Sequence, residues 1–101
     1  MSLNELQKEI AAAVAKRFPN EYTPIERFVA ITAQIGELGD LLLIREGVKE
    51  NHKNQHNSCE EALVNAFIDS FLLSEQLHIN LDEKIRDTLS WFEEVYKSEQ
   101  I

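Results

Sequence analysis

The sequence predicts an all-α fold with four helices. Four helix-start signals occur along the chain, and apolar residues recur at steps of three and four after each of them. No segment alternates apolar and polar residues as a half-buried strand does. The 101 residues are enough for one domain with one core, so we expect a single helical domain over residues 1–101.

The first two helices are predicted over residues 3–18 and 24–46. Ser2 and Thr23 each precede a glutamate by three residues, which is the pattern of a capping box. Pro24 stands at the first helical position of the second helix, where its missing N–H leaves no hydrogen bond unmade. Apolar residues then follow at helical spacing in both segments.

The third and fourth helices are predicted over residues 59–77 and 81–98. Ser58 and Asn80 are the capping residues, each with a glutamate three positions later. The third helix is apolar nearly all round, so we expect it to lie at the centre of a small bundle. The polar stretch 48–57 has no apolar period and is expected to form a loop.

Composition excludes several classes of protein. The net charge of −8 argues against binding to a nucleic-acid polymer, which favours a basic face. No apolar run approaches the roughly 20 residues of a membrane span, and the polar N-terminal segment lacks the core of a signal peptide. The single Cys59 excludes an internal disulfide framework, and together these features predict a cytoplasmic protein.

Two carboxylates in the middle of apolar helices are the main candidates for chemistry. Glu37 is flanked by Ile35 and Leu38, and Asp69 lies among Phe and Ile side chains. A free carboxylate in such a place is costly unless it is paired, and a divalent cation shared between two helices is one such partner. Mg²⁺ prefers oxygen ligands and is often completed by substrate phosphates, which points to chemistry on phosphates.

Other polar residues share these helix faces at spacings of three or four. The alternative interpretation is that all of them are surface acids and amides of amphipathic helices, because Asp and Glu are mostly exposed. The weaker candidates for the metal site are Gln34, Asp40, Glu61 and Asn65.

The chain resembles the MazG-like nucleotide pyrophosphohydrolases, an all-α superfamily, over nearly its whole length. Gly36-Glu37-Leu38 matches the second-helix motif, Phe67-Ile68-Asp69 matches the third-helix motif, and His78-Ile79-Asn80-Leu81 matches the turn before the fourth helix. The resemblance implies a four-helix MazG-like bundle that assembles through helix packing into a homodimer or homotetramer.

The resemblance also implies a reaction, in which Mg²⁺, or Mn²⁺, supports cleavage of a nucleoside triphosphate to monophosphate and pyrophosphate. Glu37 and Asp69 would be metal ligands at the second position of each acidic motif. The first positions hold Gln34 and Ala66, which are not carboxylates. Lys84 and Arg86 lie near the place where the family often has a phosphate-binding basic residue.

Two functions therefore follow from the sequence. The first is a magnesium-dependent nucleoside triphosphate pyrophosphohydrolase. The second is a module with a weakened metal site, which binds a nucleotide without cleaving it or contacts another protein. The apolar patch of Trp91, Phe92, Val95 and Tyr96 is either core or a dimer interface, where aromatic residues concentrate.

A transition-metal site at His52, His56 and Cys59 is a further possibility that the sequence offers. Their spacing is compatible with metal binding, but they lie in a polar stretch and a fourth ligand is not evident. Exposed polar residues are the simpler interpretation.

Overall fold

The computed structural model describes residues 1–18, 21–50 and 58–99, and these fold into four α-helices. They are α1 (Leu3–Arg17), α2 (Pro24–Arg45), α3 (Cys59–Gln76) and α4 (Leu81–Glu99). The predicted all-α class is confirmed, and each helix begins at the predicted residue and ends within one residue of the predicted end. In the described part of the chain, no helix combines the length and apolar character needed to cross a membrane.

The four helix starts are held by the capping residues that the sequence indicates. The side chains of Ser2, Thr23, Ser58 and Asn80 each accept a hydrogen bond from the backbone N–H three residues later, at 3.1 to 3.3 Å. At α2 the box is complete, because the Glu26 carboxylate accepts the Thr23 backbone N–H at 2.9 Å. Local sequence therefore fixes where the helices begin.

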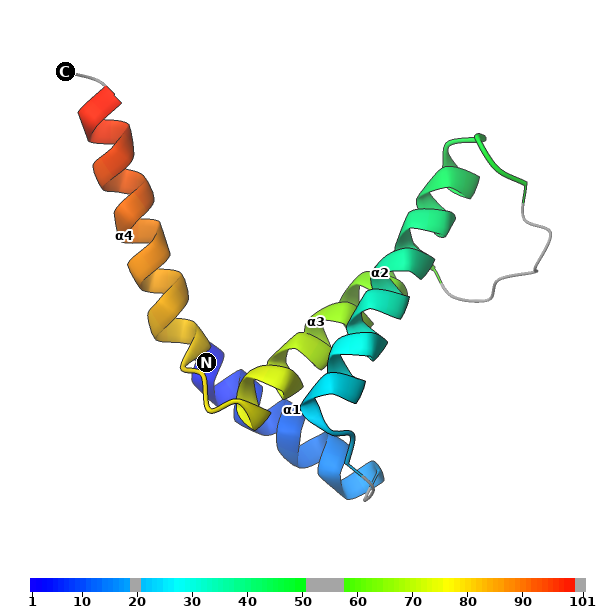
Figure 1. Ribbon diagram of the computed structural model, residues 1–101, viewed down its shortest axis with the longest axis horizontal. Helices are drawn as coiled ribbons and strands as arrows, with labels where there is room; N and C mark the ends of the chain where they lie inside the picture. Colours follow the sequence, from blue (N-terminus) through cyan, green and yellow to red (C-terminus); the bar gives the residue numbers. More distant parts are fainter. Residues whose placement is uncertain (19–20, 51–57, 100–101) are drawn as a thin grey trace.

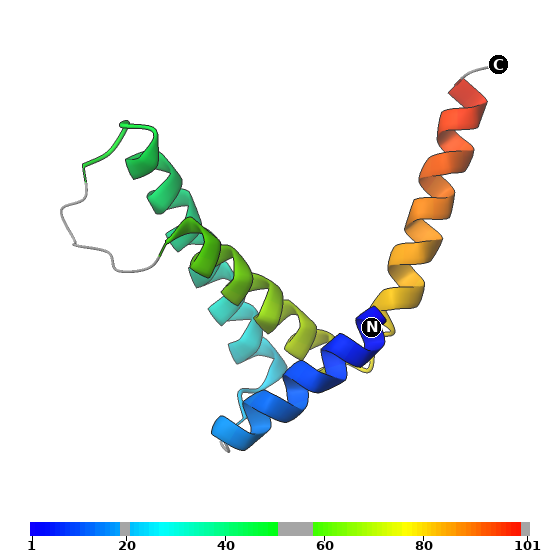
Figure 2. The same ribbon diagram turned by 180° about the vertical axis from the view of Figure 1, so that it is seen from behind.

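Helices α2 and α3 pack side by side as an antiparallel hairpin, and α1 crosses one end of it (Figure 1). Helix α1 packs against α3, so α3 lies between α1 and α2 as predicted for the central helix. Helix α4 touches α1 and then leaves in another direction, so that α4 and the hairpin diverge as two arms in both views (Figures 1 and 2).

The buried core is small for a chain of this length. Among the described residues its apolar members are Ile31, Leu41, Ala62, Ala66 and Leu72, which all come from α2 and α3. The predicted apolar stripes are buried only in part, since many large apolar side chains of α2, α3 and α4 remain exposed. No residue of α4 is buried.

The connection between α3 and α4 is short and closed by hydrogen bonds. Leu77 N–H donates to the Leu73 carbonyl, and Ile79 N–H donates to the Ser74 carbonyl. His78 adopts a left-handed backbone conformation with φ of 55°. Such a residue ends a helix and redirects the chain, so His78 sets the direction in which α4 leaves.

We expect Thr23→Ala to lower the free energy of unfolding by about 1 kcal/mol, because it removes the cap of α2. The backbone N–H and the hydroxyl of Thr23 hold the pKa of Glu26 below its ordinary value. The contribution of this carboxylate is therefore present at neutral pH and is lost as acid protonates it. Urea denaturation at pH 7 measures the change.

The matched control is Thr32→Ala in the same helix, where the hydroxyl only bonds the Val29 carbonyl within the helix. It should be neutral or slightly stabilising, because Ala is the better helix former. Equal losses in the two variants would show that the cap contributes nothing of its own.

Candidate functional site

A cavity of about 890 Å³ lies where α1 crosses the α2–α3 hairpin. Small-molecule sites in proteins fall in this size range. Its described lining comes from α1, α2, α3 and the segment before α2, and no α4 residue belongs to it. The lining residues are Ala11, Val14, Ala15, Arg17, Phe18, Glu21, Tyr22, Arg27, Ala30, Gln34, Asn65, Ile68, Asp69, Leu72, Glu75 and Gln76.

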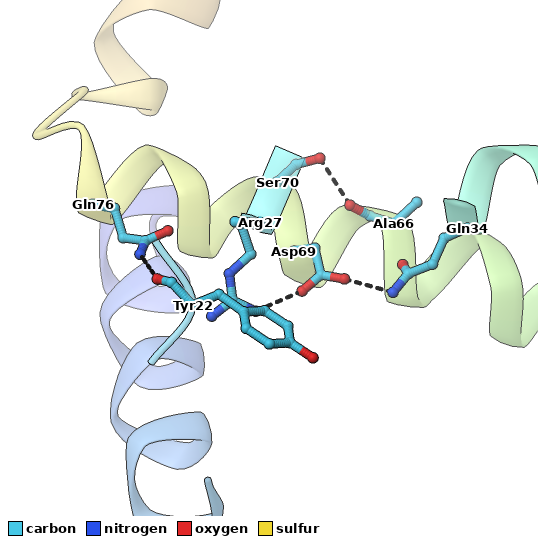
Figure 3. Close-up of polar contacts among 7 residues, drawn as sticks. All are labelled: Tyr22, Arg27, Gln34, Ala66, Asp69, Ser70 and Gln76. Carbon is cyan, nitrogen blue, oxygen red and sulfur yellow. Dashed lines mark hydrogen bonds and ion pairs between the residues drawn. The ribbon is translucent and has the colours of Figure 1, made fainter. Parts of the chain in front are cut away.

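Asp69 of α3 is the polar centre of this cavity (Figure 3). One of its carboxylate oxygens accepts a hydrogen bond from Arg27 Nη1 at 2.9 Å, and the other accepts from the side-chain amide of Gln34. Arg27 and Gln34 are seven residues apart, so they lie on one face of α2. Both oxygens of the carboxylate are thus held by α2.

The Arg27–Asp69 pair is buried, with only 11% and 12% of the two side chains exposed. Breaking a buried pair is expensive, because removal of one charge leaves the other without compensation in a place of low dielectric. The Arg27 guanidinium also lies over the Tyr22 ring in a cation–π contact, with 5.0 Å between the guanidinium carbon and the ring centroid. The carboxylate that the sequence singled out is therefore neutralised by a cation of the chain itself.

Two further contacts tie the surrounding segments to α3. The Gln76 amide donates to the Tyr22 backbone carbonyl, which fixes the segment that leads into α2 (Figure 3). The Gln7 amide of α1 donates to Glu75 at 2.9 Å, although Gln7 is 4% exposed and sits among helices. Both glutamines form side-chain hydrogen bonds that link segments far apart in the sequence.

Three buried polar atoms of the lining residues have no hydrogen-bond partner within the described residues. They are Arg27 Nε, Gln34 Oε1 and Gln76 Oε1. The two amide orientations are fixed, because the Asp69 carboxylate and the Tyr22 carbonyl accept hydrogen bonds and must face an N–H. An unsatisfied buried polar group costs about 1–3 kcal/mol. A polar ligand in the cavity that reached these groups would recover part of this cost.

The structure brings some of the predicted site residues together and separates others. Gln34 and Asp69 bond directly, and Asn65 lines the same cavity. Glu37 is half-buried on α2 and does not line the cavity. Asp40 forms an ion pair with Lys49 at 2.8 Å.

The remaining candidates lie elsewhere. Glu61 is exposed in the first turn of α3, where its N–H bonds the capping Ser58. Lys84 and Arg86 are on α4, and Arg86 pairs with Asp82 one turn earlier. His52 and His56 lie outside the described residues, and Cys59 begins α3.

The donor set around Asp69 does not fit a magnesium ion. Both Asp69 oxygens already accept hydrogen bonds, and the paired motif positions hold an amide at Gln34 and a methyl group at Ala66. Over residues 1–18, 21–50 and 58–99, no three His, Cys, Asp or Glu side chains gather as a metal site requires. The magnesium or manganese site at Glu37 and Asp69 stays a prediction from the resemblance.

Arg27, Tyr22 and Gln76 are site residues that the sequence analysis missed. Arg27 could have been found, because it is a cation four residues before Ile31 on the apolar face of α2 and seven before Gln34. Tyr22 and Gln76 gave no signal, since their contact joins residues 54 positions apart.

No family model, curated protein or solved structure matches this chain. The structure shows a four-helix, all-α fold that is compatible with a MazG-like plan.

We expect Arg27→Met to lower the free energy of unfolding by about 3–5 kcal/mol, because the Asp69 carboxylate stays buried without its cation. The double variant Arg27→Met/Asp69→Leu should regain most of this loss, since no buried charge remains. Chemical denaturation of the unmodified chain, the two single variants Arg27→Met and Asp69→Leu, and the double variant measures the coupling between the two residues.

The exposed pair on α4 supplies the control. Arg86→Met removes a similar ion pair, with Asp82, but should change stability by less than about 1 kcal/mol because the pair is screened by water. If Arg27→Met lowered the free energy of unfolding by no more than Arg86→Met does, the buried pair would not be what stabilises the site.

Proposed function

We propose that the chain is a MazG-like nucleotide-binding module that holds its ligand without cleaving it. The observation that carries the proposal is the pairing of Asp69 with Arg27 and Gln34. The Arg27 guanidinium supplies positive charge from within the chain, and the Gln34 amide donates to the second oxygen. The resemblance in the two acidic motifs supports a nucleotide as the class of ligand, and the cavity supports a ligand of small-molecule size.

The charges of the cavity favour the nucleoside part of the nucleotide over its phosphates. The described lining has two guanidinium groups, Arg17 and Arg27, against three carboxylates, Glu21, Asp69 and Glu75. A triphosphate carries several negative charges and gains little from such a lining. A planar, neutral base with both N–H and C=O groups matches the aromatic Tyr22 and the amides of Gln34 and Gln76 much better.

The second candidate is the magnesium-dependent pyrophosphohydrolase. It is favoured by Glu37, which is half-buried one turn after Gln34 on the helix that packs against Asp69. For this activity Asp69 would have to exchange its hydrogen bonds with Arg27 and Gln34 for a metal ion. The two candidates therefore differ in whether a metal ion is needed and whether the ligand is cleaved.

Calorimetric titration with nucleosides and nucleoside mono- and triphosphates tests the binding module. We expect binding in the presence of EDTA, with a nucleoside bound as tightly as its triphosphate. Ala15→Phe should abolish it, because Ala15 is an exposed residue of α1 that lines the cavity, and the larger ring would fill the space. Absence of binding by every compound would overturn the proposal.

The control variant is Ala12→Phe, which places the same ring on the same helix at an exposed position outside the cavity lining. It should bind as the unmodified chain does. If both variants lost binding equally, the ligand would be recognised somewhere other than this cavity.

Pyrophosphate release from a panel of ribo- and deoxynucleoside triphosphates, with Mg²⁺, Mn²⁺ or EDTA, tests the second candidate. We expect no release above the EDTA control, because both Asp69 oxygens already accept hydrogen bonds from α2. Metal-dependent release that disappears in Asp69→Asn would establish the pyrophosphohydrolase instead.

A further inference from the structure

The chain exposes far more surface than a folded monomer of its size. Its accessible surface is 7920 Å², whereas a monomeric protein of this mass exposes about 5,800 Å². Its radius of gyration is 17.3 Å, against about 13 Å for a compact chain of 100 residues. The excess area, roughly 2,100 Å² by this scaling, is well above the approximately 800 Å² that each partner of a standard interface buries.

Part of this excess is an apolar face on the α2–α3 hairpin. Phe28, Ile35 and Leu42 are seven residues apart and therefore share one side of α2, and each is 41–57% exposed. Leu63 and Phe67, one turn apart on α3, are also exposed. None of the five lines the cavity beneath α1. We call these five residues the hairpin face.

Gly39 gives the hairpin face room for another helix. It lies four residues after Ile35 and three before Leu42, so it belongs to the same side of α2. A Cβ at Gly39 would meet nothing within 4 Å in the described structure. A glycine inside a helix costs about 1 kcal/mol relative to Ala, and none of the described residues fills the space beside Gly39.

The second unpartnered surface is the apolar stripe of α4. Ile85, Leu89, Phe92 and Tyr96 recur at steps of three and four, and all four are exposed. We call them the α4 stripe. A lone helix of this length is only marginally stable in water, so an amphipathic helix needs a surface to pack against. Its own chain offers little beyond α1, because α4 and the hairpin diverge (Figures 1 and 2).

A second copy of the chain is the occupant that covers both surfaces. Each chain carries one hairpin face and one α4 stripe, so two chains related by a two-fold axis can match the hairpin face of each copy with the α4 stripe of the other. The excess area is large enough for two such contacts in one dimer.

We propose that the chain forms a two-fold symmetric dimer in which the α4 stripe of each copy packs on the hairpin face of the other. This proposal is independent of the cavity and of any ligand in it. In the homo-oligomer that the sequence predicts, the contact surfaces would then be the hairpin face and the α4 stripe. The dimer strengthens with salt, because screening reduces the repulsion between two acidic chains.

Sedimentation equilibrium of the full chain measures the dimer and its dissociation constant. We expect a dimer at micromolar concentration, and a loss of affinity of roughly 30-fold or more in Phe67→Glu and in Phe92→Glu, since each places a charge at the centre of the contact. Ser90→Glu should leave the dimer unchanged, because Ser90 lies five residues after Ile85 on the other side of α4.

Mixing the two variants tests which surfaces meet. Phe67→Glu retains an intact α4 stripe and Phe92→Glu retains an intact hairpin face, so a mixed pair keeps one of the two contacts. We expect the mixture to form a heterodimer of intermediate affinity, while each variant alone stays monomeric. Far-UV circular dichroism checks that both remain helical, and Phe67→Ala and Phe92→Ala replace any variant that unfolds.

Three results would overturn the proposal. The first is a monomeric wild-type chain over the whole concentration range, which would mean that α4 folds back on its own hairpin. The second is a dimer unaffected by either variant. The third is a mixture of the two variants without heterodimer, which would mean that each surface pairs with its own kind.

Discussion

The buried carboxylate of Asp69 is the constraint on which the rest of the structure depends. A charge in that position must be met by hydrogen bonds and by an opposite charge, and α2 supplies both through Arg27 and Gln34. Because these two residues are seven apart, the requirement fixes how far α2 can slide along α3. The same contacts place a polar group in the lining of the cavity, so helix pairing and the polarity of the cavity both depend on Asp69.

The parts of the fold that local sequence controls were predictable. The capping residues and the helical spacing of apolar residues place all four helices, because these signals act within one turn. The site was predictable only in part. Asp69 and Gln34 were both singled out and do meet. The spacing places Arg27 on the same face of α2 as Gln34, but it could not show that both side chains reach Asp69. Helical periodicity gives the face of a helix, whereas the register between two helices depends on distant side chains.

The apolar stripes show a second limit of the sequence. Phe28 and Ile31 belong to one stripe, yet Ile31 is buried and Phe28 is 53% exposed. The apolar stripe of α2 is wider than one neighbouring helix can cover. The sequence pattern shows this width, but it does not show whether the helix that covers the rest belongs to the same chain. The three-dimensional arrangement separates the two parts, because the buried part faces α3 and the rest faces outward.

The left-handed backbone conformation at His78 makes the position of the far end of α4 sensitive to small rotations at this residue. The helix has 19 residues and is therefore roughly 28 Å long. A change of about 20° in its direction at this one joint would move its far end by about 10 Å. The left-handed region of backbone conformation is small for a residue that carries a side chain, so the joint has a limited range while His78 stays within it. The direction of α4 therefore depends on the backbone conformation of this joint and on the contact between α4 and α1.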